Sequence, residues 1–139
     1  MTLQGFYPVI MTEDVAAGAE FYRRHFGFET VFEADWYVSL RHAESGHELA
    51  ILQANHPSVP EGFRTSVAGV LLNFEVEDAV SEYERLVKRA GIALVQDIRD
   101  EEWGQRHFIM GDPSGALIDV IETIPATGVY AAGGEGSNG

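Results

Sequence analysis

One carboxylate lies where a strand of apolar side chains is predicted, and it is the first candidate for chemistry. Asp119 interrupts the apolar run 117–121, and a carboxylate buried among apolar groups costs free energy unless it is paired or hydrogen-bonded. Its side chain could bind a cationic group of a ligand, pair with Arg106, act as a general base, or be held by another partner within the protein. Strand alternation places Asn73 and Glu75 on the same type of surface, where they could add polar contacts.

Two tryptophans stand beside acidic residues in segments that are otherwise polar. Trp103 follows the acidic run 97–102, where an indole ring is costly unless protein or a ligand covers it. Gly104 beside it would let a flat ring approach the backbone. Trp36 and Tyr37 also follow carboxylates, and such rings suit a cationic or polycyclic guest. In a second interpretation, Trp103 closes the edge of a sheet, and Trp36 and Tyr37 contact another copy of the chain.

Other kinds of chemistry find no support in the residue types. No metal-ligand spacing links the five histidines, which are His25, His42, His47, His56 and His107. The sequence does not fix the face to which His107 points. The chain has no cysteine, which excludes disulfides, thiolate zinc sites and cysteine nucleophiles, and it has no glycine-rich phosphate loop or serine nucleophile motif. The pair Glu101 and Glu102 is assigned to a solvated face.

An internal repeat supplies the elements that must position these residues. In the first half, a strand-like segment precedes Asp14, which opens a helix that stops at Gly27. In the second half, a similar segment precedes Asp78, and the helix that follows stops at Gly91. Each acid lies 13 positions before its glycine. An acidic helix start and a glycine stop that recur at one spacing indicate a duplicated supersecondary unit.

Strand-like segments fill the rest of each half. The predicted strands are 6–11, 29–33, 37–41 and 48–52 in the first half, and 70–76, 93–96, 106–110 and 117–121 in the second. The fold class is therefore α+β, with two tandem βαβββ modules within one domain. The predicted boundaries are 5–53 for the first module, 54–66 for a linker, 67–124 for the second module and 125–139 for a flexible tail. One helix covers only one face of each sheet, so we expect two curved mixed sheets whose remaining faces enclose a cleft.

This plan resembles the vicinal oxygen chelate superfamily, which includes glyoxalase I, extradiol dioxygenases, the fosfomycin resistance enzymes, and the bleomycin and mitomycin resistance proteins. The resemblance rests on the two modules, on the aromatic pattern within residues 21–28 and on the Asp-Pro-Ser-Gly turn at 112–115, and it covers roughly residues 5–124. The fold hosts both enzymes and pure binders, so the choice between them must come from the site.

The metal-dependent members resemble one another in placing His, Gln or Glu at four strand positions that face the cleft. Here those positions fall on Tyr7, Ala50, Leu71 and Asp119, and Asp119 alone among them suits a divalent ion. The resemblance therefore implies a protein without a metal or another cofactor. Tyr7 would face the cleft, and Leu71 and Ala50 would supply apolar wall.

The closer match is to the members that bind no metal. The mitomycin and bleomycin resistance proteins are similar to this chain in size and acidity, and they act as homodimers that trap a drug without altering it. The stretch from Trp103 to Arg106 resembles the loop of the mitomycin-binding protein whose tryptophan stacks on the planar ligand, which implies the same role for Trp103.

The expected function is capture of a planar or cationic natural-product antibiotic, of bleomycin, mitomycin or enediyne type, without modification. No residue is predicted to be catalytic or to bind a metal. The predicted ligand-binding residues are Tyr7, Trp36, Tyr37, Leu71, Asn73, Glu75, Trp103, Gly104, Arg106 and Asp119. Two enzymatic alternatives stay open. One is a metal-dependent lyase, isomerase or dioxygenase, and the other is a metal-free enzyme that uses Asp119 as a base.

Charge and composition restrict the partners. Acidic residues number 22 against 9 basic ones, for a net charge of -13, and such a field repels nucleic acid and anionic lipid surfaces while it attracts cationic small molecules. No apolar run is long enough to predict a membrane-spanning helix, and no signal peptide is visible. We therefore expect a cytoplasmic protein that binds a small molecule, and the resemblance implies that it is a homodimer.

Overall fold

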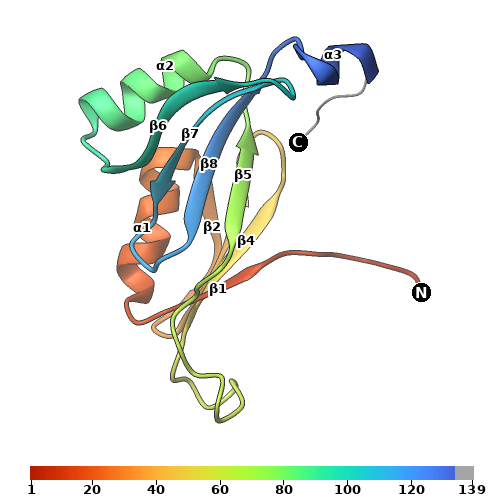
Figure 1. Cartoon of the computed structure of the whole chain (residues 1–139). Coiled ribbons are helices and arrows are strands. Elements are labelled where there is room, and N and C mark those ends of the chain that lie inside the picture. The colour runs from red at the N-terminus through yellow and green to blue at the C-terminus, as the bar shows by residue number, and fades with distance from the viewer. Residues whose placement is uncertain (134–139) are drawn as a thin grey trace. The chain divides into compact units, whose positions relative to one another are not determined.

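The computed structural model describes residues 1–133, which form two compact units. The first unit holds residues 1–69 together with the turn 112–116, and the second holds residues 70–111 and, of the described residues, 117–133. Each unit is built on a four-stranded mixed sheet (Figure 1). The predicted α+β plan of two tandem βαβββ modules is confirmed. None of the helices in residues 1–133 has both the length and the apolar character needed to cross a membrane.

The sheet of the first unit has the strand order β1-β4-β3-β2. Its strands are β1 (Val9–Thr12), β2 (Phe28–Ala34), β3 (Tyr37–His42) and β4 (Glu48–Gln53). The pair β1 and β4 is parallel, and the other two pairs are antiparallel. A parallel pair requires a crossover, which α1 (Val15–Phe26) begins.

Both ends of α1 follow the predicted signals. The Asp14 carboxylate accepts a hydrogen bond from the backbone N–H of Ala17, at 3.0 Å, as a helix N-cap does. Gly27 closes the helix in the left-handed region, with φ of 72°. The helix buries Tyr22 completely and brings Gly18 against the side chain of Ile51 on β4. One face of the first sheet is thereby covered.

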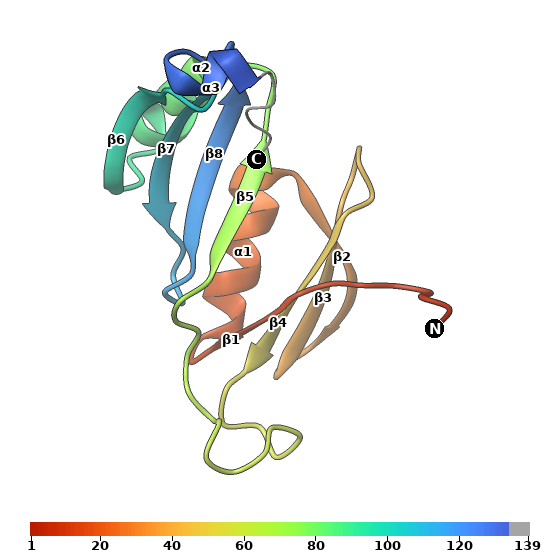
Figure 2. The same cartoon turned by 45° about the vertical axis from the view of Figure 1, so that its right-hand side comes forward.

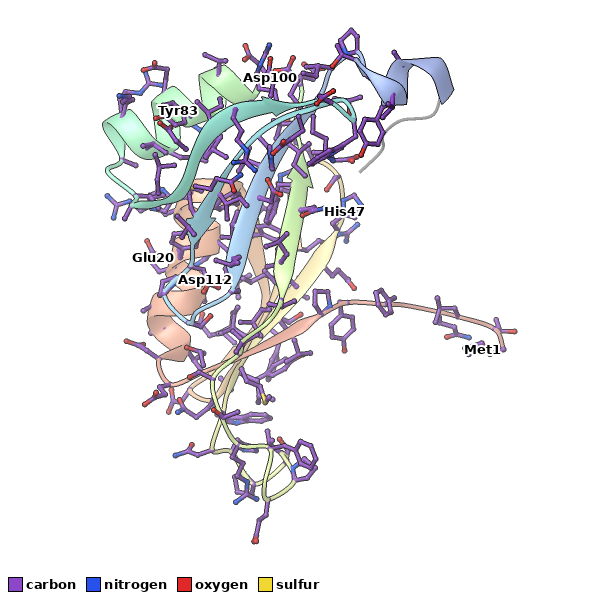
Figure 3. All side chains as sticks on the ribbon, in the orientation of Figure 1. Met1, Glu20, His47, Tyr83, Asp100 and Asp112 are labelled. Carbon is purple, nitrogen blue, oxygen red and sulfur yellow. The ribbon has the colours of Figure 1, made fainter. Side chains whose placement is uncertain are left out.

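The Asp-Pro-Ser-Gly turn has a structural reason. One carboxylate oxygen of Asp112, Oδ1, accepts hydrogen bonds from the backbone N–H groups of Ser114, Gly115 and Ala116 and from the Ser114 hydroxyl. The other oxygen, Oδ2, accepts the hydroxyl of Tyr22, at 2.5 Å, so the turn lies beside α1 (Figure 3). Burial, together with the charge and hydrogen bond of Asp112, raises the pKa of Tyr22 above its ordinary value of 10.

The sheet of the second unit has the order β5-β8-β7-β6 (Figure 2). Its strands are β5 (Leu71–Glu75), β6 (Leu94–Glu101), β7 (Gln105–Gly111) and β8 (Leu117–Thr123). Helix α2 (Ala79–Tyr83) starts at Asp78, whose carboxylate accepts from the N–H of Ser81 at 3.1 Å, and runs into a π-helical segment, η1 (Glu84–Arg89). The Tyr83 ring meets the buried ring of Phe108 edge-on, 5.3 Å between centroids, so this helix covers the face on which Phe108 lies.

Three predictions about the limits or the type of an element are corrected. The first strand begins at Val9 rather than at residue 6, because Pro8 has no N–H for the ladder, although its carbonyl accepts from Ala50. The second helix is not one regular α-helix, since its latter half is π-helical. Strand β6 runs to Glu101 instead of ending at residue 96, and its acidic residues are supported by partners across the strand pair, such as Asp100 with Arg106.

The end of the chain is partly described. Of the residues predicted as a flexible tail, 129–133 form a short helix, α3 (Val129–Gly133), while 134–139 lie outside the described residues. The segment before α3 is held to the β6–β7 turn by two backbone hydrogen bonds, Ile124 to Gly104 and Thr127 to Glu102.

Candidate functional site

The second sheet has a face turned away from α2, and the register shows which residues share it. Directly paired residues point to the same face of a sheet. One row across the sheet consists of Asn73, Asp119, Ile109 and Gln96. The next row consists of Glu75, Ile121, His107 and Arg99, and a third joins Thr123, Gln105 and Glu101. We call these rows the helix-free face of the second unit.

Four charged side chains of this face form a chain of contacts. Asp119 Oδ1 lies 2.8 Å from His107 Nδ1, and His107 Nε2 lies 2.8 Å from Glu101 Oε2. Glu101 Oε2 also accepts from Arg99 Nε, at 2.7 Å. The side chains of His107 and Asp119 are each 7% exposed and that of Glu101 is 12% exposed, whereas that of Arg99 is 58% exposed. This series of contacts therefore leads from solvent, at Arg99, to the buried Asp119 on the central strand β8.

The geometry favours the cationic form of His107. A neutral imidazole has one N–H and one lone pair, so one of its nitrogens would face a carboxylate without a proton between them. With a carboxylate on each nitrogen, the cationic ring can donate on both sides. Burial lowers the pKa of His107, but the hydrogen bonds and charges of Glu101 and Asp119 outweigh it and hold the pKa above its ordinary value of 6.5. The hydrogen bond from His107 in turn lowers the pKa of Glu101, with help from Arg99.

This arrangement limits what the four residues can do. The charges of Arg99 and His107 offset those of Glu101 and Asp119, so these four side chains together are formally neutral. A metal requires the lone pair of a neutral imidazole, and both nitrogens of His107 are engaged. Asp119 Oδ1 lies 2.8 Å from His107 Nδ1, so a base at this position would act as an aspartate–histidine pair and not as a lone carboxylate. The predicted option that Asp119 pairs with Arg106 is wrong, because its partner is His107.

Arg106 lies on the other face of β7. It neighbours His107 in the strand, so the two side chains point to opposite faces. Its guanidinium contacts both carboxylate oxygens of Asp100, at 2.8 and 3.1 Å, and lies 3.9 Å from Glu122. Arg106 therefore lies on the face opposite to that of Asp119, and its predicted role in binding stays a prediction.

Trp103 is held at the end of the helix-free face. Its indole Nε1 donates to Gln105 Oε1, at 2.9 Å, and its ring meets that of Tyr130 edge-on, 6.2 Å between centroids. The residue remains 38% exposed. The indole is thus fixed through its nitrogen while part of the ring stays open to a partner.

The close approach of the backbone of residue 124 requires a glycine at position 104. Its φ is +107°, and an added Cβ would lie 2.8 Å from the carbonyl oxygen of Ile124. The close approach predicted at this glycine is therefore made by residues 124–126. Its use by a flat ligand ring stays a prediction.

Uncompensated polar groups gather at both edges of the helix-free face. On the edge strand β5, Leu71, Asn73 and Glu75 are exposed, and the Glu75 carboxylate has no hydrogen bond or ion pair with any of residues 1–133. On β6, Gln96 Nε2 is buried without a hydrogen-bond partner among these residues. An unpaired buried donor is uncommon, and an ordered water or a carbonyl of a ligand would satisfy it.

The first unit holds the other predicted site residues. Trp36 is stacked on His56, with 3.9 Å between ring centroids and 11° between planes, and it also contacts Tyr37. Burial raises the pKa of Tyr37, as do the charge and hydrogen bond of Tyr7. Tyr7 precedes β1 and is 47% exposed. These three aromatic residues form one group within the first unit. Ala50, which was predicted to supply apolar wall, lies on β4 and is fully buried.

The four positions that carry a metal in metal-dependent members do not fit one here. The side chains of Tyr7, Ala50 and Leu71 supply no carboxylate or imidazole, and Asp119 is engaged with His107. Within residues 1–133, no group of three or more His, Asp or Glu side chains is arranged to hold a metal ion. The donor set is therefore unsuitable for a divalent ion at these positions.

Comparison with known proteins places the fold. A model of the glyoxalase/bleomycin resistance protein/dioxygenase superfamily matches residues 6–120. The chain belongs to this superfamily. Its resemblance to the vicinal oxygen chelate plan is thereby confirmed. A search of curated proteins finds no match.

Solved structures with this fold include three that illustrate its range. A lactoylglutathione lyase from Agrobacterium tumefaciens is 18% identical, with a TM-score of 0.69 over 87% of this chain and 95% of its own. A superfamily member from Sphaerobacter thermophilus is 22% identical, with a TM-score of 0.70 over 87% and 98%. A glyoxalase-related enzyme from Fulvimarina pelagi is 23% identical, with a TM-score of 0.69 over 87% and 89%. At these identities the likeness establishes the fold and leaves the activity open.

Sequence reasoning misses three residues of this chain of contacts, Arg99, Glu101 and His107. The assignment of Glu101 to a solvated face is wrong, since its carboxylate is largely buried against His107. His107 itself has no face assigned by the sequence. The sequence does contain an indication of this contact. A buried Asp119 needs a cationic partner, and side-chain alternation can place His107, on the neighbouring strand, on the same face of the sheet. Finding Glu101 requires knowing that β6 extends past residue 96.

Proposed function

We propose that this superfamily member is a metal-free binding protein that captures a planar, cationic or polycyclic natural product without altering it. One observation carries the proposal: the ionisable residues at the centre of the helix-free face neutralise one another. Asp119 and Glu101 each pair with His107, so neither is an unpaired carboxylate. What remains for a ligand is the partly open ring of Trp103 and the exposed edge of β5.

The net charge of the protein and the fixed orientation of Trp103 also support capture of a ligand. The net charge of -13 raises the local concentration of cations. Trp103 is pinned by Gln105, so stacking on it costs little side-chain entropy. We also propose that the protein works in the cytoplasm, and as a homodimer, as the resemblance to the bleomycin and mitomycin resistance proteins implies.

Tryptophan fluorescence tests the proposal directly. The purified protein is titrated with bleomycin-, mitomycin- and enediyne-type compounds, and we expect at least one to quench the emission and to raise the melting temperature. Trp103→Leu should abolish most of the binding, whereas Trp36→Leu, whose ring is already stacked on His56, should retain more of it. The compound recovered after denaturation should have an unchanged mass.

Three outcomes would contradict the proposal. One is the absence of quenching and thermal shift with every compound. A second is a recovered compound of altered mass, which indicates an enzyme. A third is elemental analysis that finds about one tightly held Zn, Ni, Fe or Mn per chain, which would favour a metal-dependent enzyme with ligands outside the four positions considered.

A further inference from the structure

The turn between β3 and β4 in the first unit brings two histidines together. His42 is the last residue of β3, and His47 immediately precedes β4 (Figure 3). The backbone N–H of His42 donates to the carbonyl of His47, at 2.8 Å, so the two residues face each other across the turn. Their separation along the sequence indicated no metal site, and only the closing of the hairpin makes them neighbours.

Both imidazoles point at one hydroxyl group. His42 Nδ1 lies 2.9 Å from Ser45 Oγ, and His47 Nδ1 lies 2.7 Å from the same oxygen. The backbone N–H of Ser45 also donates to His42 Nδ1, at 3.1 Å, so this nitrogen presents its lone pair. The hydroxyl can then donate to His42 and accept from His47. Two ring nitrogens therefore converge on a single position at the end of the hairpin.

Local contacts hold this arrangement in place. The N–H of Gly46 donates to the carbonyl of His42, at 2.9 Å, and the φ of +79° at this glycine closes the turn. The ring of His42 meets that of Phe28 edge-on, with 5.4 Å between centroids. His42 is half-buried, whereas Ser45 and His47 are exposed. An ion can therefore arrive from solvent, and little side-chain entropy is lost when the rings bind it.

Neutral imidazole is a preferred ligand of borderline divalent ions such as Zn²⁺, with a metal–nitrogen distance of about 2.0–2.1 Å. An ion at the position of the Ser45 hydroxyl would therefore require each ring nitrogen to move by less than about 1 Å. The serine side chain leaves this position by rotation about χ1, and neutral His47 frees its Nδ1 lone pair by carrying its proton on Nε2. The net charge of -13 attracts the cation.

We propose that the β3–β4 hairpin binds a divalent transition-metal ion of the Zn²⁺ class, with His42 and His47 as its protein ligands and water in the remaining positions. A hard cation such as Mg²⁺ prefers oxygen ligands and is excluded by this donor set. Neither histidine occupies one of the four metal positions of the metal-dependent members, and neither belongs to the helix-free face. The inference goes beyond the proposed function and does not depend on it.

Calorimetric titration of the full chain, first freed of metal with EDTA and dialysed, tests the proposal with Zn²⁺ as the probe. We expect Zn²⁺ to bind and Mg²⁺ to give no binding at the same concentration. His47→Ala removes one ligand from an exposed position, where the fold does not depend on it, and the affinity for Zn²⁺ should fall about tenfold or more. His42→Ala should lower it in the same way.

His56→Ala is the matched control. His56 Nδ1 also lies 2.8 Å from a serine hydroxyl, that of Ser58, and it also accepts from the N–H of that serine, at 3.1 Å. Its ring is stacked on Trp36, so it is the same local motif without the partner across the hairpin. This variant should keep the wild-type affinity for Zn²⁺. In the wild type, Zn²⁺ should shift the imidazole NMR signals of His42 and His47 and leave those of His56 unchanged.

The proposal is overturned if Zn²⁺ does not bind, if Mg²⁺ binds equally well, or if His47→Ala keeps the wild-type affinity. A loss in His56→Ala as large as that in His47→Ala would also refute it, because binding would then not depend on the hairpin pair.

These outcomes are separate from those of the proposed function. Zn²⁺ on the hairpin should be removed by EDTA and should be lost in His47→Ala. Metal that stays bound to His47→Ala after dialysis lies elsewhere in the protein, and it counts against the proposed function. Quenching of Trp103 by a natural product tests that function whether or not the hairpin binds Zn²⁺.

Discussion

Replacement of Asp119 by asparagine tests the buried charge chain, because it removes one charge and nearly preserves the shape. In the folded protein, the side chains of Asp119 and His107 are each 7% exposed and 2.8 Å apart. Removing one partner of a buried pair costs about 3–5 kcal/mol when the other is left alone. His107 keeps Glu101 in this variant, so the loss should be that of one charged hydrogen bond, about 2–3 kcal/mol.

The loss should depend on pH. His107 has a raised folded-state pKa, so the stability it contributes is fully present below about 6.5 and is lost as the pH rises through that pKa. Glu101 has a lowered pKa, so its contribution is present above about 4.5 and is lost as the pH falls through the folded-state value. The chain of contacts is therefore most stabilising between these two values.

At alkaline pH the same substitution should have a different effect. A neutral His107 between two carboxylates is unfavourable, because one carboxylate then faces a nitrogen lone pair. The amide introduced by Asp119→Asn carries N–H groups that can donate to this lone pair, so the variant should lose little or no stability there.

Urea unfolding of the wild type and Asp119→Asn at about pH 5.5 and about pH 9 measures both effects. Asp100→Asn is the matched control, since it makes the same change on an exposed ion pair with Arg106, and such pairs contribute little. A loss of unfolding free energy for Asp119→Asn that is no larger than that for Asp100→Asn would refute the buried contact between Asp119 and His107. A loss of equal size at both pH values would show that His107 does not lose its proton between them.

Two further predictions concern the elements that hold the site. Tyr22→Phe removes the hydroxyl that Asp112 accepts inside the first unit, and urea unfolding should show a loss of about 1–3 kcal/mol because a buried carboxylate oxygen loses its donor; an unchanged midpoint would contradict this. Gly104→Ala combines a φ of +107° with a Cβ 2.8 Å from a backbone carbonyl, and should cost about 2–4 kcal/mol. Gly91→Ala has a φ of +74° and open space around the Cβ, so it should cost clearly less, and equal losses would show that the contact with Ile124 is unimportant.

Much of the fold can be predicted because its signals are local. Asp14 and Asp78 cap helices with their own side chains, and Gly27 ends the first one through its own φ. The turn at Asp112 is likewise held by hydrogen bonds within five residues. The repeat of these signals is sufficient to predict two βαβββ modules and the superfamily.

The candidate site can be predicted only in part. Strand parity correctly places Asn73, Glu75 and Asp119 on one face, because alternation depends on the single strand. The partner of Asp119 depends on which strand lies beside β8, and the sequence alone offers Arg106 as readily as His107. These two are neighbours in β7 and point to opposite faces, so a shift of one residue in register exchanges them.

The sequence by itself determined the elements, their order and the lack of metal-binding side chains at Tyr7, Ala50 and Leu71. The tertiary structure decided how the charges are used. Glu101, His107 and Asp119 come from three strands, and their contacts arise only when β6, β7 and β8 pair in one register. Capping and turn formation act over a few residues, whereas the protonation of a buried histidine depends on every charge that the fold brings within a few ångströms.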